Sequence, residues 1–346
     1  MTTKEKILET LLKSDTVSGE MLSQRFNVSR TAVWKAISSL REEGYKIDAT
    51  TNRGYRLKQF PDKLDATQIR AEIESCGVKA GEIFVFPEID STNNEAKRQA
   101  AHVSSFRDEH GALTEGGKKL HRALFVSGMQ TAGRGRLGRE FVSPKNAGAY
   151  FSLVYAPENG VKNPALLTAS AAVAVCRALD SLFDTNSKIK WVNDVLLDFG
   201  GVEKKVTGIL TEGIANFESG KVEVAVVGIG INVREVDFDK NLSKIAGSVE
   251  EFLSKKERSL SVSRNSVIAK TIAELLKIYD SKENVIEEYK NRSCLIGKTV
   301  RVNPLSGDEP FFALVDGIGN EAELLVCTKN GERRTLLSGE VSLHEE

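Results

Sequence analysis

The chain has 346 residues, of which 40% are hydrophobic, and its 48 lysines and arginines balance 48 aspartates and glutamates at a formal net charge of zero. A neutral chain of this length is long enough for two or three domains with apolar cores, and any contact with nucleic acid must come from a local basic patch. The four cysteines and four histidines lack the spacing of a disulfide framework or a metal site. We therefore expect reduced thiols and no metal held by the protein alone.

The first 60 residues predict a winged helix-turn-helix domain. Apolar residues at helical spacing indicate one helix around Ile7 to Leu12 and a second after Ser18, and Ser29 is a candidate cap for a third helix over Arg30 to Glu43. Two short strand patterns on either side of a turn at 52–54 then predict a hairpin, the wing.

This segment carries eleven lysines and arginines against seven acidic residues, a net charge of +4. In such a fold the second helix of the pair enters the major groove by its N-terminal residues, and the wing lies along the backbone or a minor groove. We expect Trp34 to pack in the core of this domain, as part of the apolar face of the third helix. The alternative is a protein-contact module whose basic side chains are only solvated. The candidates for DNA contact are Arg30, Thr31 and Lys35 on the helix and Arg53 and Arg56 on the wing.

A linker candidate at 60–65 and a helix over 66–75 lead into a central domain. Several strands there follow one another without a helix, which predicts a mixed, largely antiparallel sheet. The alanine-rich run 165–183 is interrupted by Arg177 and Asp180, so we expect a buried core helix and not a membrane span. Since Met1 to Glu9 is charged and not signal-like, we expect a cytoplasmic protein. The expected strands are 83–86, 124–127, 150–155, 189–192, 206–212 and 222–229, and the expected helices are 94–101 and 164–183.

The last hundred residues predict a change of structure. Helical spacing of apolar residues continues over 252–291, and from Gly297 short strand patterns alternate with Gly, Asn and Asp turns. The expected strands are 299–302, 311–316, 322–327 and 333–337.

The segment Gly133 to Arg139 packs three glycines and three arginines into seven residues, directly after the apolar run 123–126. Glycines let the backbone approach a ligand closely, and each arginine offers a planar fork of donors that matches a carboxylate or phosphate. The segment has no Gly-Lys-Ser/Thr ending and no dinucleotide fingerprint, so it is neither of the common phosphate loops. The alternative is a solvated basic surface loop.

Five motifs in this order make the chain resemble a biotin protein ligase: Ser91-Thr-Asn93, Gln130 to Arg139, Lys190-Trp-Val-Asn-Asp194, Lys205-Val-Thr-Gly-Ile-Leu210 and Gly228-Ile-Gly-Ile-Asn232. With its N-terminus, the chain looks like the bifunctional type that also represses the biotin operon. It departs from the family at Val192, where proline is usual, at Phe141, where tryptophan is usual, and in two longer loops, 104–122 and 199–204.

The resemblance implies an α+β fold in three parts: a winged helix-turn-helix DNA-binding domain (1–60), a class II-synthetase-like ligase domain with a mixed sheet (61–293), and an SH3-like C-terminal β-barrel (294–346). It implies ATP-dependent transfer of biotin, through biotinyl-5'-AMP, to a lysine of a biotin carboxyl carrier domain of acetyl-CoA carboxylase. Mg²⁺ would arrive with ATP. The implied partners are that carrier protein, operator DNA and, with the adenylate bound, a second copy of the chain.

The resemblance also assigns residues. Lys205, Arg136 and Asp194 are the catalytic candidates, with Asp194 orienting the incoming amine. The biotin-binding candidates are Ser91, Thr92, Asn93, Gln130, Gly133, Arg134, Arg136 and Lys205. The ATP and adenylate candidates are Arg134, Arg136, Arg139, Asn193, Lys205 and Asn232. Two alternatives remain at this point: a lipoate-type ligase, and a non-enzymatic regulator that senses biotin.

Overall fold

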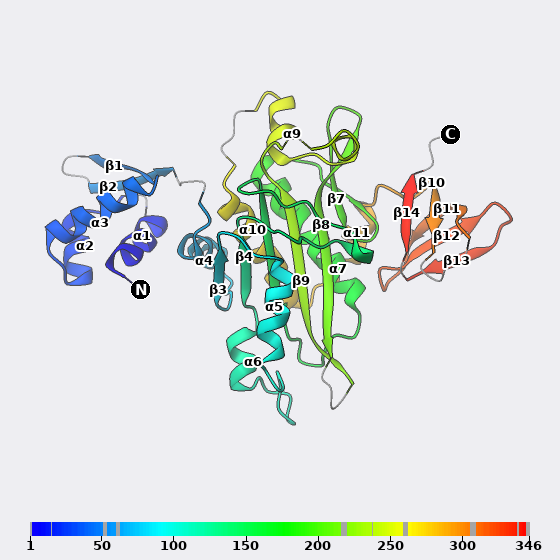
Figure 1. The fold of residues 1–346 in the computed structure, drawn as a ribbon, viewed down its shortest axis with the longest axis horizontal. Helices are drawn as coiled ribbons and strands as arrows, with labels where there is room; N and C mark the ends of the chain where they lie inside the picture. Colours follow the sequence, from blue (N-terminus) through cyan, green and yellow to red (C-terminus); the bar gives the residue numbers. More distant parts are fainter. Residues whose placement is uncertain are drawn as a thin grey trace.

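The structure is a computed structural model that describes residues 2–14, 16–50, 54–59, 63–215, 220–236, 238–258, 262–304, 309–337 and 339–343. Figure 1 shows a small N-terminal domain at one end, a large central sheet with its helices in the middle, and a C-terminal sheet at the other end.

The N-terminal domain has the elements that the sequence predicts: α1 (Thr3–Lys13), α2 (Gly19–Phe26), α3 (Arg30–Glu42), β1 (Lys46–Thr50) and β2 (Gly54–Gln59). The hydroxyls of Ser18 and Ser29 each accept a hydrogen bond of 3.1 Å from a backbone N–H in the first turn of α2 and α3, which fixes where those helices begin. β1 and β2 pair antiparallel as the wing. The core of this domain includes Ile7, Leu8, Leu11, Leu22, Val33, Ile37 and Leu40.

The assignment of Trp34 to packing is wrong. The buried face of α3 consists of Val33, Ala36, Ile37 and Leu40, while Trp34 is 58% exposed. Each step along a helix turns the side chain by about 100°, so a residue next to a buried one can point fully into solvent. The candidate Arg53 lies outside the described residues.

The central domain is built on a seven-stranded sheet in the order β3-β4-β5-β9-β8-β7-β6. Only β3 and β4 pair in parallel, and the other five pairings are antiparallel, which confirms the mixed, largely antiparallel sheet. Its strands are β3 (Ile83–Phe86), β4 (Leu124–Ser127), β5 (Gly148–Tyr155), β6 (Lys188–Lys190), β7 (Asp194–Asp198), β8 (Glu203–Ala215) and β9 (Val222–Asn232).

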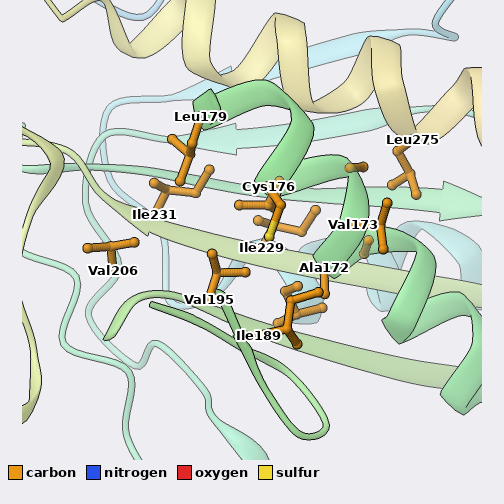
Figure 2. Close-up of a cluster of buried hydrophobic side chains, with 14 of the residues drawn as sticks. Ala172, Val173, Cys176, Leu179, Ile189, Val195, Val206, Ile229, Ile231 and Leu275 are labelled. Atoms are coloured by element: carbon orange, nitrogen blue, oxygen red, sulfur yellow. The ribbon is translucent and has the colours of Figure 1, made fainter. Parts of the chain in front are cut away.

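Helix α7 (Pro164–Phe183) packs between this sheet and α10 (Arg264–Ser281), as Figure 2 shows. Cys176 of α7 lies against Ile229 of β9, and Leu275 of α10 lies beside Val173; all four side chains are buried. Within the described residues α7 is the one helix long and apolar enough to cross a membrane, but most of it is buried in this core. The predicted core helix is confirmed. The other helices of this domain are α4 (Ala66–Ser75), α5 (Thr92–Ala101), α6 (Glu115–Leu120), α8 (Leu242–Ile245), α9 (Val249–Lys255) and α11 (Ile286–Asn291), and Arg136–Gly138 forms one 3-10 turn.

Two predictions for this domain are wrong in detail. The helical region 252–291 is broken into α9, α10 and α11: α9 ends at Lys255, and Lys282 takes a left-handed conformation that ends α10. The strand expected over 189–192 ends at Lys190, where the chain turns into β7. The longer loop 104–122 contains α6, which Thr114 caps, and Phe106 within it is buried.

The C-terminal sheet has the antiparallel order β13-β12-β11-β10-β14. Its inner side chains, such as Val300 and Leu324, belong to the same buried cluster as the central core. The pairings among the described residues leave β13 and β14 as outer strands, so an SH3-like closed barrel stays a prediction. The strands are β10 (Thr299–Asn303), β11 (Phe311–Ile318), β12 (Leu324–Thr328), β13 (Arg333–Leu336) and β14 (Glu340–Leu343).

Candidate active site

A cavity of about 420 Å³ brings most of the charged candidates together. Its walls come from the arginine-glycine loop (residues 133–139), the turn between β6 and β7, strand β8, and two strands of the C-terminal sheet. The lining residues include Arg134, Arg136, Arg139, Phe141, Lys190, Asn193, Asp194, Lys205, Asn303, Gly339, Val341 and Ser342.

Lys205 and Asp194 form an ion pair inside this cavity, with Nζ and Oδ1 2.7 Å apart. They meet because β7 pairs antiparallel with β8, with Asp194 opposite Gly208 and Lys205 opposite Leu196. The neighbouring Lys204 points the other way and pairs with Glu251 at 3.1 Å, since successive residues of a strand face opposite sides. The structure therefore separates the two lysines and puts Lys205 in the site.

Arg136 is half-buried and reaches two different domains. Its guanidinium lies 3.4 Å from Asn193 Oδ1 and 3.4 Å from the carbonyl oxygen of Gly339 in the C-terminal domain. Asn193 is itself held by a 2.8 Å hydrogen bond from Nδ2 to the carbonyl of Ile209. The arginine is thus aimed into the cavity by partners from both sides, whereas Arg139 is exposed at its rim.

Four uncharged candidates line a second, narrow cavity of about 30 Å³ beside the first: Ser91, Thr92, Asn93 and Gln130. Gln130 Oε1 accepts hydrogen bonds from the backbone N–H of Thr92 at 2.9 Å and from its hydroxyl at 3.2 Å. Phe141 and Arg134 line both cavities, so the polar and the charged site adjoin each other. The residues around the narrow cavity are Ser91, Thr92, Asn93, Gln130, Arg134, Phe141, Gly208, Leu210, Gly228, Ile229 and Gly230.

The ring of Phe141 rests directly on the backbone of two strands. A Cβ at Gly230 would lie 2.4 Å from Phe141 Cε1, and a Cβ at Gly208 would lie 3.0 Å from Phe141 Cε2. Both positions therefore need glycine while the ring lies there. The glycines 208, 228 and 230 keep the floor of the site flat, and Phe141 covers part of it.

Sequence reasoning missed a set of partners behind this floor. Ser152 is fully buried, and its hydroxyl lies 2.7 Å from Thr92 Oγ1 and 2.6 Å from Asn93 Oδ1. Asn93 Nδ2 donates to Glu212 Oε2 at 2.8 Å, and Lys97 pairs with the other carboxylate oxygen of Glu212 at 2.6 Å. Burial of Glu212 works against its charged form, but these hydrogen bonds hold the pKa of Glu212 below its usual range. The one sign of this network in the sequence was Ser152, a polar residue within the otherwise apolar strand β5.

A second missed partner is Ser143. Gln130 Nε2 donates to Ser143 Oγ at 2.9 Å, and the Ser143 hydroxyl donates to the carbonyl of Phe141 at 2.8 Å. Ser143 thereby connects the side-chain amide of Gln130, in the narrow cavity, to Phe141, which follows the arginine-glycine loop. Gly133 is buried in the same place, where a Cβ would lie 2.3 Å from the Phe141 carbonyl oxygen.

Two groups of candidates lie apart from both cavities. Asn232 lines neither one, and its side chain donates to the carbonyl of Gly247 at 3.1 Å. The DNA candidates Arg30, Thr31, Lys35 and Arg56 are all exposed on α3 and β2 of the N-terminal domain.

The chain thus joins a helix-turn-helix domain to a mixed-sheet domain that carries a cavity lined by basic side chains. Residues 119–232 match the model of the biotin/lipoate A/B protein ligase family, and residues 3–56 match the model of an HTH domain. The chain is 31% identical to the bifunctional ligase/repressor BirA of Bacillus subtilis over 94% of each chain. It is 26% identical to the protein of that name from Escherichia coli, over 98% of this chain and 96% of the relative.

The chain belongs to the family of bifunctional biotin ligase/repressors. Its fold is similar to that of a solved biotin protein ligase from Aquifex aeolicus in complex with biotin and ATP. That structure has a TM-score of 0.57 and 24% identity, and the match covers 77% of this chain and 99% of the other.

Proposed function

We propose that this protein activates biotin with ATP and transfers it to a lysine of a biotin carboxyl carrier domain, and that it represses biotin genes in response to the adenylate. One observation carries the ligase part: a cavity with Lys205, Asp194 and Arg136 on its walls adjoins a polar pocket formed by Ser91, Thr92, Asn93 and Gln130. A carboxylic acid with a polar ring fits this pair of sites, with the ring in the polar pocket and the carboxylate near the cations.

In the first step, a carboxylate oxygen of biotin forms a bond to the α-phosphorus of ATP, and the bond from that phosphorus to pyrophosphate breaks. Two anions meet in this step. Arg136 and Lys205 offset their repulsion and stabilise the charge that develops on the phosphorus oxygens, which is usually the largest catalytic contribution in such a site. Arg134 and Arg139, at the rim, add donors for the phosphates.

In the second step, the amine of the acceptor lysine attacks the carbonyl carbon of biotinyl-AMP. The new amide C–N bond forms, the C–O bond to AMP breaks so that AMP leaves as its phosphate anion, and the proton lost by the amine passes to solvent. Asp194 is a carboxylate within the cavity, at the position where it can orient that amine and accept a hydrogen bond from it.

Magnesium is proposed to enter with ATP, as a counterion of its phosphates. Among the described residues no group of three or more His, Cys, Asp or Glu side chains forms a metal site. Asp194 is the acidic side chain beside the cationic wall of the cavity, and Glu140 lies at its rim. Those residues fit an ion carried mainly by the nucleotide.

Binding of biotin requires Phe141 to move. The polar cavity of about 30 Å³ is too small for a bicyclic ring system. Phe141 and Arg134 line this cavity, and they belong to a segment whose residue Leu137 is exposed and has a left-handed conformation. We infer that the loop lifts to admit biotin and then closes over the adenylate, which keeps water from the anhydride.

For the repressor part, the helix-turn-helix domain is proposed to bind operator DNA as part of a homodimer that forms when the adenylate is bound. Arg30, Thr31 and Lys35 are exposed at the start of α3, where such a helix contacts base edges. We further propose a cytoplasmic protein with domains at 1–60, 61–293 and 294–346, a class II-synthetase-like ligase domain and an SH3-like C-terminal domain.

The test is biotin-dependent exchange of labelled pyrophosphate into ATP. Lys205→Ala and Arg136→Ala should lose exchange by two orders of magnitude or more, because each removes a cation beside the reacting phosphate. Lys204→Ala is the matched control, since its side chain pairs with Glu251 and not with the cavity. Full exchange in either of the first two variants would refute the assignment.

The same assay separates the alternatives. A lipoate-type ligase would give exchange with lipoate and not with biotin. Absence of exchange, with DNA binding that still responds to biotin, would favour a regulator that only senses biotin.

A further inference from the structure

We propose that Trp34 reads DNA sequence directly, by placing its indole ring against thymine methyl groups in the major groove. This inference rests on the proposed operator binding, and it assigns a residue and a base chemistry to it.

The observation is the exposure of a large apolar side chain at the centre of a polar helix face. Trp34 is 58% exposed, whereas Trp191, the other of the two tryptophans in the chain, is 4% exposed. Among the described residues, Trp34 belongs to neither the core of the N-terminal domain nor that of the central domain. An exposed indole is unfavourable in water, so the position calls for a partner that buries it.

The neighbours of Trp34 indicate what that partner is. Residues three and four apart share a helix face, which puts Trp34 beside Arg30 and Thr31 and one step before Lys35. All four are exposed in the first half of α3. Glu20 of α2 pairs with Arg30 at 3.2 Å, but α3 itself carries no acidic residue before Glu42. The surface around the indole is therefore basic, which fits a polyanion.

DNA offers an apolar group on the floor of its major groove, where the recognition helix lies. The major groove exposes the 5-methyl group of each thymine, and apolar side chains contact it, while cationic side chains bind guanine edges or phosphates. Burial of one methyl group contributes about 0.8 kcal/mol, or about a four-fold change in affinity. Trp34 can supply this contact, whereas Arg30, Thr31 and Lys35 supply hydrogen bonds and charge.

The test uses a change that removes only the methyl group. The full chain, with biotin and ATP present, first selects a duplex from a random pool. Each thymine of that duplex is then replaced in turn by deoxyuridine, and binding is followed by fluorescence anisotropy. We expect binding by the wild-type chain to weaken about four-fold at one or two thymines per half-site.

Trp34→Ala should bind the thymine duplex about tenfold more weakly and should no longer respond to deoxyuridine at those positions. Lys35→Ala is the control. It should weaken binding and lower the slope of log affinity against log salt concentration by about one, because it removes one phosphate contact, but it should keep the response to deoxyuridine. Because Trp34 is exposed, Trp34→Ala should unfold at the wild-type temperature. Acrylamide quenching of the exposed indole should fall when the duplex is added, and Trp34→Phe should lose that signal.

Three results would overturn the proposal, and they have different meanings. If Trp34→Ala binds like the wild type, or keeps its response to deoxyuridine, the reading role is wrong while operator binding stands. If the wild-type chain selects no duplex, operator binding fails and this inference fails with it. A change in sedimentation of the DNA-free chain on Trp34→Ala, with DNA affinity intact, would make the surface a protein interface instead.

Discussion

The hydroxyl of Tyr45 donates a 3.0 Å hydrogen bond to Asp65 Oδ2, across the junction between the N-terminal and central domains. The other carboxylate oxygen of Asp65 accepts from the backbone N–H of Gln68 and caps α4, and its own N–H donates to Asn265 Oδ1 on α10. Burial and the nearby carboxylate of Asp65 raise the pKa of Tyr45, so the hydroxyl stays protonated as a donor. One aspartate thus links the DNA-binding domain to two helices of the ligase domain.

Tyr45→Phe should lower the free energy of unfolding by about 1.5 kcal/mol, because it removes one of the hydrogen bonds that the Asp65 carboxylate accepts. Pyrophosphate exchange should not change, since both residues are far in the fold from the cavity that holds Lys205. Urea unfolding measures the first and the exchange assay the second. Tyr55→Phe is the control, because no hydrogen bond of the Tyr55 hydroxyl is found among the described residues, and equal unfolding curves for both variants would contradict the role of this contact.

Ser143→Ala should raise the KM for biotin about tenfold with little change in kcat. The substitution removes the acceptor of Gln130 Nε2 and the donor to the Phe141 carbonyl, so both the amide and the loop lose their fixed position. Steady-state kinetics at varied biotin concentration measures the effect. Ser75→Ala, which removes a hydroxyl bonded only to the carbonyl of Glu72 in its own helix, should behave as wild type. A fall in kcat alone would argue for a different role.

Glu212→Gln should weaken biotin binding about fivefold and lower the free energy of unfolding by about 1 kcal/mol. The amide keeps one oxygen for Asn93, but its NH₂ group then faces the ammonium of Lys97, and two donors meet. Asn93 is displaced as a result. Calorimetric titration with biotin reports the affinity. Glu95→Gln is the control, because Glu95 pairs with the exposed Arg98, and such pairs contribute little.

The imidazole of His121 should make stability depend on pH. Burial, together with Arg122 and Arg107, lowers the pKa of His121 from 6.5 to about 4, against the opposing effect of Asp280. The unfolded chain therefore takes up a proton near pH 6.5 that the folded chain resists until about pH 4. Stability from this group is present above pH 6.5 and is lost as the pH falls towards 4, by on the order of 2 kcal/mol.

His121→Gln should flatten that dependence. Its side-chain oxygen can still accept the hydrogen bond that Ala156 N–H donates to His121 Nδ1 at 3.2 Å, but it has no proton to bind. Urea unfolding at pH 7 and pH 5 compares the two proteins. His102→Gln, on the exposed end of α5, is the control. The interpretation fails if wild type and His121→Gln lose the same stability between these two pH values.

Local patterns in the sequence were enough to predict α7 at its exact bounds, the cap Ser29, and a largely antiparallel sheet. Helix periodicity, capping and strand alternation depend on residues a few positions apart, so they can be recognised from the sequence alone. The family motifs likewise pointed to Lys205, Asp194 and Arg136, which the fold brings into one cavity.

Contacts between distant residues were decided by the tertiary structure alone. Asn93 meets Glu212 119 positions away, and Arg136 meets Gly339 203 positions away, and no local pattern encodes such a pairing. The same holds for Trp34: its spacing was compatible with packing, and only the position of α1 and α2 against Val33 and Ile37 turned its ring outward. Burial is a property of what packs on a face, and that is set by the whole fold.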